Sequence, residues 1–260
     1  MPMIISKSKF VAGWQCLKRL YLLVHKPDSA DDVDAGDFAL MEQGQQVGEL
    51  ARGLFPGGIL VEAASLGDSI RITRELLARP DVPAIFEGAF EHGGVYVRVG
   101  ILQRCRGSRW RLIEIKSSAS LKDEHLPDVA IQSHVLTESG IDLASCFLAH
   151  VNRAYIYPGG AIDPWRFFRI KNVTRRIESL LPKVPSQLRA EFRVISSSEA
   201  PEIESGPHCS DPRRCEFYDR CNLPIPDNDV RFLPNISTKV VIKLRELGVS
   251  SIRDIPDAFE

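Results

Sequence analysis

The stretch from residue 96 to residue 118 constrains the fold of this chain more than any other. Apolar and polar residues alternate at 96–99 and again at 110–116, and a basic loop containing Gly107 and Ser108 separates the two runs. Alternation of this kind predicts two antiparallel strands joined as a hairpin. On the second strand Glu114 and Lys116 are two residues apart, so their side chains project from the same face.

Glu114 and Lys116 form a pair with a definite chemical use. A carboxylate at the end of an apolar strand can hold a hard cation such as Mg²⁺ or Mn²⁺. The neighbouring ammonium group can orient an attacking water or offset charge that develops on a phosphate. The pair therefore suits hydrolysis of a phosphodiester bond. It also suits a plain surface ion pair, because Glu-x-Lys is a common tripeptide.

The residues that follow the pair extend the pattern. Glu-Ile-Lys-Ser-Ser at 114–118 is followed by Asp-Val-Ala-Ile-Gln at 128–132, which fits a helix. This order resembles the RecB-like branch of the PD-(D/E)XK nuclease superfamily. The resemblance implies an α/β, restriction-endonuclease-like fold, in which helices flank a mixed sheet. It also implies an active site with Glu114, Lys116 and Gln132. A buried Gln that bonds to backbone is the other interpretation of Gln132.

Gly100 departs from the family pattern. The resemblance places a metal-binding Asp on the first hairpin strand, where this chain has Gly100, and Leu136 stands in place of a Tyr after the Gln. Glycine is disfavoured inside strands, so this position indicates a bulge, an inactivating replacement or a carboxylate supplied from elsewhere. Glu87, on a predicted strand at 84–90, is the nearest candidate carboxylate. An ordinary polar residue on a solvated strand face is its other interpretation.

These residues favour two functions. The first is a divalent-metal-dependent, exonuclease-like DNA nuclease, in which Glu114 and Glu87 bind Mg²⁺ or Mn²⁺, Lys116 orients water or phosphate, and Gln132 supports the site. The second is a catalytically inactive nucleic-acid-binding or scaffold protein on the same fold, because Gly100 supplies no ligand to the ion. In both cases we expect DNA as the partner, with single-stranded ends for the nuclease.

The cysteines suggest a metal site. Cys209, Cys215 and Cys221 lie within a short, turn-rich segment, and Cys16 is far away in the sequence. One cysteine before the core and three after it resembles the iron–sulfur RecB-like nucleases, which include CRISPR adaptation exonucleases and AddB-type nucleases. The resemblance implies a 4Fe–4S cluster on these four thiolates that ties the C-terminal segment to the first helix. Zinc, held by the three thiolates with Cys16 or His208, would instead give a zinc-stabilised interaction domain. Unrelated free cysteines are the third interpretation.

Periodicity and capping signals predict the remaining elements. The first helix, at 10–22, carries Cys16 together with Lys18 and Arg19, which either contact phosphate or lie on a solvated face. The resemblance places a metal ligand on the second helix, where Glu49 is the nearest candidate. We expect helices at 38–52, 66–78 and 128–139, a buried strand at 141–151, an edge strand at 167–173, and a helix at 173–190 interrupted near Pro182 and Pro185.

Residues 231–255 resemble a helix-hairpin-helix element, which in DNA-processing proteins presents backbone N–H groups to phosphate. A plain helical packing unit fits the same residues. We therefore expect a RecB-like domain at 1–225, including the metal-cluster cysteines, and a small tail at 226–260. No obvious finishing element precedes Glu260, so a further domain or a protein partner is expected.

The overall charge limits how this chain could bind nucleic acid. A net charge of −1 over 260 residues provides no general electrostatic attraction, so any binding surface must be local. The sequence has no apolar run long enough for a membrane span and no signal peptide. We therefore expect a cytoplasmic protein without membrane contact, whose cysteines stay reduced and available to metal.

Overall fold

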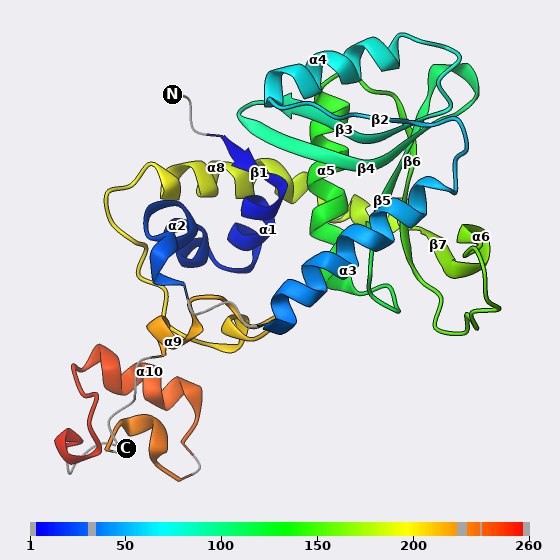
Figure 1. Ribbon diagram of the computed structural model, residues 1–260. Helices are drawn as coiled ribbons and strands as arrows, with labels where there is room; N and C mark the ends of the chain where they lie inside the picture. Colours follow the sequence, from blue (N-terminus) through cyan, green and yellow to red (C-terminus); the bar gives the residue numbers. More distant parts are fainter. Residues whose placement is uncertain (1–3, 31–34, 223–227, 235, 257–260) are drawn as a thin grey trace.

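A mixed sheet forms the centre of the molecule (Figure 1). The computed structural model describes residues 4–30, 35–222, 228–234 and 236–256. Within that part the sheet has seven strands in the order β2-β3-β4-β5-β6-β7, and β1 pairs with β4. The strands are β1 (Ile5–Ser6), β2 (Ile59–Leu60), β3 (Ala84–His92), β4 (Val95–Arg104), β5 (Trp110–Lys116), β6 (Leu143–Val151) and β7 (Phe168–Asn172).

The strand pairing confirms the predicted hairpin and the α/β class. β4 and β5 are antiparallel, with Ile101 opposite Ile113, and β5 and β6 are parallel, with Glu114 beside Leu148. The strand predicted at 141–151 is an inner strand, as expected, and β7 forms the edge beyond it. The parallel neighbour on one side of β5 and the antiparallel neighbour on the other make the sheet mixed.

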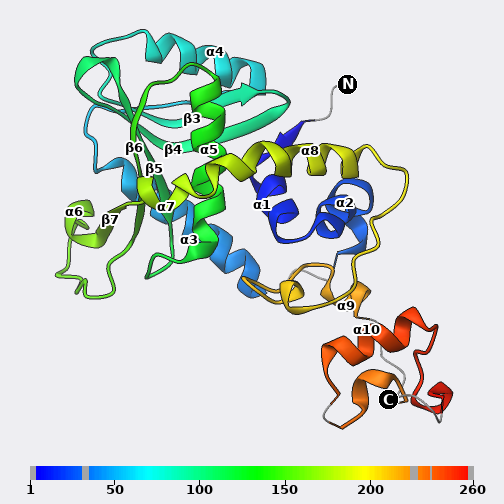
Figure 2. The ribbon, with the colours of Figure 1, turned by 180° about the vertical axis from the view of Figure 1, so that it is seen from behind.

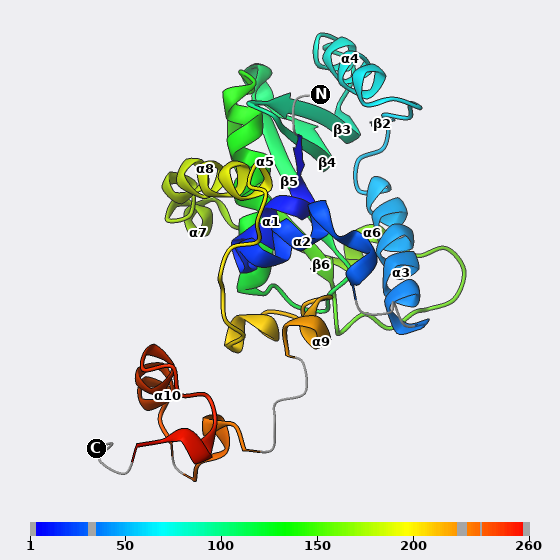
Figure 3. The same ribbon diagram turned by 90° about the vertical axis from the view of Figure 1, so that its left-hand side faces the viewer.

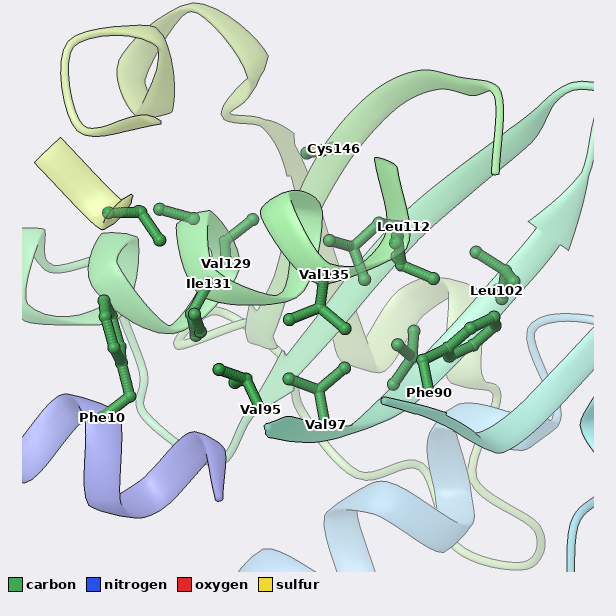
Figure 4. Packing of buried hydrophobic residues seen from close by; sticks show 14 of the residues in the cluster. Phe10, Phe90, Val95, Val97, Leu102, Leu112, Val129, Ile131, Val135 and Cys146 are labelled. Carbon is green, nitrogen blue, oxygen red and sulfur yellow. The ribbon is translucent and has the colours of Figure 1, made fainter. Parts of the chain in front are cut away.

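Helices cover both faces of the sheet (Figure 1 and Figure 2). On one face Val129 and Val135 of α5 belong to the same buried cluster as Val97 of β4 (Figure 4). On the other face Val47 of α3 clusters with Ile113 of β5. The helices are α1 (Lys7–Gln15), α2 (Leu17–His25), α3 (Ala35–Arg52), α4 (Leu66–Leu77), α5 (Leu126–Glu138), α6 (Pro164–Phe167), α7 (Thr174–Glu178), α8 (Val184–Ile195), α9 (Tyr218–Cys221) and α10 (Thr238–Glu246). No helix in the part described is long and apolar enough to cross a membrane.

The first predicted helix is wrong in one respect, because it is two helices. α1 ends and α2 begins at Cys16, whose backbone is extended with φ −160° and ψ 123°. α1 buries Phe10 in the main core, whereas α2 buries Leu20 there but also Tyr21 and Leu22 in a separate cluster with Phe217. Two packing partners in different places favour a break between the helices, and the break leaves Cys16 at the joint.

Prolines account for most of the remaining differences in helix bounds. α5 begins at Leu126, earlier than predicted, because proline is tolerated in the first turn of a helix and Pro127 lies there. The helix predicted at 173–190 is divided into α7, a 3₁₀ turn at Leu181–Lys183, and α8, which continues to Ile195. Pro182 and Pro185 each lie in the first turn of their segment, as expected of residues that interrupt a helix.

The C-terminal tail packs around a small core of its own (Figure 3). Val230, Leu244 and Val249 form that core, and the Arg245 guanidinium reaches Glu204 at 3.0 Å. In the tail residues described, one α-helix, α10, lies between 3₁₀ turns at Val230–Phe232 and Ile252–Asp254. The second helix of a helix-hairpin-helix is thus represented by a 3₁₀ turn. Residue 226, the predicted domain boundary, lies outside the described residues.

Glu191 of α8 carries a buried carboxyl group. Its side chain is fully buried, and Gln187 Nε2 donates to Oε1 at 2.9 Å. Oε2 has no hydrogen-bond partner in the part of the chain that is described. Glu191 packs against Gly13 of α1, where an added Cβ would lie 2.5 Å from Oε1. Burial raises the pKa of Glu191 to about 8, so the carboxyl is largely protonated at neutral pH.

This raised pKa predicts a pH-dependent stability. As pH rises from about 4.3 towards 8, Glu191 ionises more readily in the unfolded chain than in the folded one, so stability falls. Glu191→Gln cannot ionise and therefore removes this loss. Its free energy of unfolding should exceed that of the wild type by more at pH 9 than at pH 5, and this advantage should grow by about 2 kcal/mol between the two pH values. Urea unfolding at both pH values measures it. Glu178→Gln, at an exposed site on α7, is the control, and an equal effect of the two variants would contradict the expectation.

Candidate active site

Glu114 and Lys116 lie together on β5, as the strand periodicity predicts. The Lys116 ammonium is 3.0 Å from Glu114 Oε1. Glu114 is only 4% exposed, so this is not the plain surface ion pair that the tripeptide also allowed. A buried carboxylate needs compensating partners, because removing a charge from water is costly.

Helix α5 supplies two further groups from the neighbouring layer. Gln132 Nε2 donates to Glu114 Oε2 at 2.9 Å and to Asp128 Oδ1 at 3.3 Å. Asp128 also forms an ion pair with Lys116. The sequence predicted that Gln132 faces the strands, but the role of Asp128 was missed. The signal was available, since residues four apart share a helix face.

Lys7, the first residue of α1, completes the arrangement. Its ammonium lies 3.1 and 3.2 Å from the two Glu114 oxygens and 3.3 Å from Asp128 Oδ1. Sequence analysis missed this residue, because it is 107 positions from Glu114 and carries no local motif. Lys7, Glu114, Lys116 and Asp128 are called the charged cluster below. Two ammonium groups and two carboxylates make its formal charge zero.

Each charge in the cluster fixes the protonation of the others. Burial opposes ionisation of Glu114, but the ammonium groups of Lys7 and Lys116 outweigh it and hold the pKa of Glu114 well below its usual range. Burial also works against the charge on Lys116, yet Glu114 and Asp128 raise its pKa. The pKa of Lys7 is raised by Asp128 and Glu114 against the same burial penalty. All three groups therefore stay ionised at neutral pH.

On β3, Glu87 lies between Phe86, which pairs with Ile101, and Gly88, which pairs with Val99, so the register of β3 and β4 places it across from Gly100. Its φ of 54° is in the left-handed region, which costs a non-glycine residue about 1–3 kcal/mol and is often found at functional sites. Burial raises the pKa of Glu87, the charge of Glu114 raises it further, and Lys7 opposes both. Glu87 is therefore within electrostatic reach of the charged cluster, unlike a residue on a solvated face.

Gly100 leaves room for a side chain. A Cβ added there would lie 3.6 Å from Ile115 Cγ1 and 3.6 Å from the Ile113 carbonyl oxygen, which are ordinary contacts. Its φ is not in the left-handed region. The glycine is thus not required by backbone conformation or by packing, so an aspartate can be introduced without a steric clash at Cβ.

A groove of about 760 Å³ opens beside the charged cluster. Lys7, Lys116 and Asp128 line it, together with Trp14 of α1 and Arg213 of the cysteine-rich segment. Aromatic and cationic side chains along one groove are the combination that binds single-stranded nucleic acid. The cluster therefore borders a space large enough for a polymeric ligand.

The four predicted cysteines line a second, smaller cavity, the cysteine cavity. Cys16 reaches it from the α1–α2 joint, and Cys209, Cys215 and Cys221 reach it from the segment after α8. Two backbone N–H groups donate to sulfur here, to Cys209 Sγ at 3.5 Å and to Cys215 Sγ at 3.4 Å. Burial raises the pKa of Cys215 to about 11, so its thiol keeps its proton at neutral pH unless a cation holds the thiolate.

Neither the charged cluster with Glu87 nor the cysteine cavity is a preformed site for a single metal ion. In the part of the chain that the structure describes, no three His, Cys, Asp or Glu side chains are grouped as ligands of one ion. Glu114 and Glu87 are therefore not part of such a group, and neither are the thiols with His208. Glu49, the other carboxylate considered from the sequence, is exposed on α3.

The solvated-face interpretation is wrong for Arg19, whose side chain is buried. Arg19 is 3% exposed, and its Nε donates to Glu216 Oε2 at 2.7 Å. The Lys18 ammonium donates to the Ile203 carbonyl oxygen at 3.2 Å. Both residues therefore connect α2 to the C-terminal segment.

The ion pairs of Glu114 should contribute stability above acidic pH. Its lowered pKa means that this contribution is complete above the unfolded-state value of about 4.3 and is lost as pH falls towards the folded value. Glu114→Gln should therefore lower the free energy of unfolding by about 3 kcal/mol at pH 7 and by less near pH 3.5. Urea titrations at both pH values test this. Glu75→Gln, in an exposed ion pair with Arg71, should change either value by less than about 1 kcal/mol.

Comparison with known proteins finds similarity among solved structures. No protein-family model matches the chain, and no curated protein matches it. Among solved structures, it is similar to the alkaline exonuclease LHK-Exo of Laribacter hongkongensis, alone and in complex with dAMP. Each match has 13% identity and a TM-score of 0.43, and covers 74% of this chain and 88% of that one. The crystal structure of SSO0001 matches with 15% identity and a TM-score of 0.38, over 85% and 86% of the two chains.

Proposed function

We propose that this chain is a DNA nuclease of the PD-(D/E)XK type that hydrolyses phosphodiester bonds with a divalent ion. The observation that carries this proposal is the convergence of Glu114, Lys116 and Gln132 from β5 and α5 beside an open groove. These are the residue types, in the order along the chain, that the resemblance assigns to such a site. DNA with single-stranded ends fits the groove best, because Trp14 can stack on unpaired bases.

The divalent ion would be held by Glu114 and Glu87. Mg²⁺ commonly takes one or two protein carboxylates and completes its shell with water and substrate phosphate, so three protein ligands are not required. When bound, such an ion polarises the phosphate and lowers the pKa of a coordinated water. Lys116 offsets charge on the phosphate, and Gln132 fixes the orientation of Glu114 through its 2.9 Å hydrogen bond.

A second candidate is an inactive nucleic-acid-binding protein on the same fold. Gly100 supplies no carboxylate, and both oxygens of Glu114 already contact the Lys7 ammonium. An ion that must compete with a protein cation binds less tightly, and without it hydrolysis is slow. The groove and its cations would still bind phosphate in such a protein.

We also propose that the cysteine cavity holds a 4Fe–4S cluster. Four thiols around one cavity supply one ligand for each iron, whereas zinc needs all its ligands at a single point, and no such grouping is present among the residues described. The N–H groups that donate to sulfur are of the kind that tune such clusters. A cluster of this kind, with reduced thiolates, would place the protein in the cytoplasm. Zinc and a plain interaction domain are the alternative outcome.

Cleavage assays decide between the nuclease and the inactive protein. The wild type should cut single-stranded DNA in Mn²⁺, and Lys116→Ala should reduce the rate by at least about a hundredfold, since one positioned charged group contributes that much. Glu87→Gln should be equally impaired if Glu87 replaces the missing aspartate. Initial rates on end-labelled oligonucleotides in Mn²⁺ and in Mg²⁺ give the measurement.

Gly100→Asp separates the remaining outcomes. If only this variant cuts, the fold is that of a nuclease and the wild type is its binding-only form. If neither the wild type nor Gly100→Asp cuts, the nuclease proposal fails. Arg79→Ala is the matched control, because that side chain is in an exposed ion pair with Asp81. It should leave the rate unchanged.

Metal content tests the cluster. Protein purified without oxygen should be brown and contain about four irons per chain, with absorbance that fades on reduction. Cys16→Ser should lose iron and lower the melting temperature, because the cluster would join α1 to the C-terminal segment. Cys105 lies outside the cysteine cavity. Cys105→Ser should therefore keep the iron content and the melting temperature of the wild type. A colourless protein with one zinc would overturn the assignment.

A further inference from the structure

The carboxylates at the centre of the charged cluster are already neutralised by the protein's own cations. Lys7 contacts both oxygens of Glu114 and Oδ1 of Asp128 at 3.1–3.3 Å. Lys116 contacts Glu114 and Asp128 as well. Lys7 therefore occupies carboxylate oxygens that would otherwise be available to a divalent cation.

The lysine side chains of the charged cluster are more exposed than its carboxylates. The side chains of Lys7 and Lys116 are each 25% exposed, whereas those of Glu114 and Asp128 are 5% and 10% exposed. Both lysines line the groove. A ligand in the groove therefore meets these two ammonium groups more readily than Glu114, which is the least exposed of the four groups, and Asp128 lines the groove beside them. This order attracts phosphate and hinders a metal ion.

We infer that Lys7 is the resident cation of this site, and that it holds nucleic-acid phosphate in the groove without a divalent ion. The inference rests on the proposed function for the identity of its ligand, but it concerns binding and leaves hydrolysis dependent on the ion. An ammonium carries three donors and no acceptor, so after bonding to the carboxylates it can still donate to a phosphate oxygen.

Gln132 has one polar atom at the site that the protein itself leaves unsatisfied. Gln132 is fully buried, and its Oε1 has no hydrogen-bond partner in the described part of the chain. Its Nε2, by contrast, bonds to Glu114 and Asp128. Buried polar atoms of this kind are normally satisfied, so a water is expected to supply the missing donor, because a phosphodiester has no proton to donate.

DNA binding in EDTA is the first test. Fluorescence anisotropy of a labelled single-stranded oligonucleotide should show binding by the wild type without divalent ion. Lys7→Met should weaken this binding by about tenfold, because one phosphate-facing charge is lost, and added Mn²⁺ should restore it. Lys9→Met is the matched control, because Lys9 is on the same helix but does not line the groove. It should bind as the wild type does.

Manganese affinity is the second test, and it does not depend on DNA. Titration calorimetry should show Mn²⁺ binding about tenfold tighter to Lys7→Met than to the wild type or to Lys9→Met, because a competing charge is gone. Lys7→Arg keeps the charge and should resemble the wild type, which guards against a general loss of folding in the methionine variant. Thermal melts of all variants check that they are folded.

Two results would overturn the inference. One is wild-type DNA binding that disappears in EDTA, and the other is Mn²⁺ affinity that is the same with and without Lys7. Failure of the proposed nuclease is distinguishable from both. If the wild type binds DNA in EDTA but never cuts it in Mn²⁺, the nuclease proposal fails, while the assignment of Lys7 as the resident cation is supported.

Discussion

The buried charged cluster is the interaction on which the rest of the site depends. It joins β5, α5 and α1, three elements from distant parts of the sequence, through contacts among Lys7, Glu114, Lys116 and Asp128. Because unpaired charges are costly in a core, removal of one member leaves the others uncompensated. Mutual neutralisation therefore holds α1 against the sheet and sets the direction in which the ammonium groups face the groove.

Helix α1 connects this cluster to the cysteine cavity. Lys7 begins the helix, Cys16 follows its last residue, and Gln15 Nε2 donates to the carbonyl oxygens of His208 and Arg213 at 2.7 and 2.9 Å. Arg213 also lines the groove. A metal cluster in the cysteine cavity would thus stabilise one wall of the groove through a short, rigid helix. Such a role is structural and separate from the chemistry of hydrolysis.

Glu87 and Gly100 occupy neighbouring positions of the sheet near the charged cluster. The two residues are opposite each other on β3 and β4, and Glu87 is in a left-handed backbone conformation that few side chains adopt. A carboxylate that approaches the cluster from β3 differs from one on β4 in reach and orientation. Gly100 itself is not demanded by geometry, since a Cβ fits there. Under the proposed function, the balance between ion binding and phosphate binding would therefore depend on Glu87 and Lys7 together.

The sequence by itself determined the hairpin, the shared face of Glu114 and Lys116, the inner strand at 141–151 and the four candidate cysteines. Local periodicity and residue type carry that information. Only the tertiary structure decided that Lys7 joins Glu114, that the first helix breaks at Cys16, and that Glu87 is opposite Gly100. These features depend on contacts between distant segments, and spacing along a chain does not encode which distant charges become buried together.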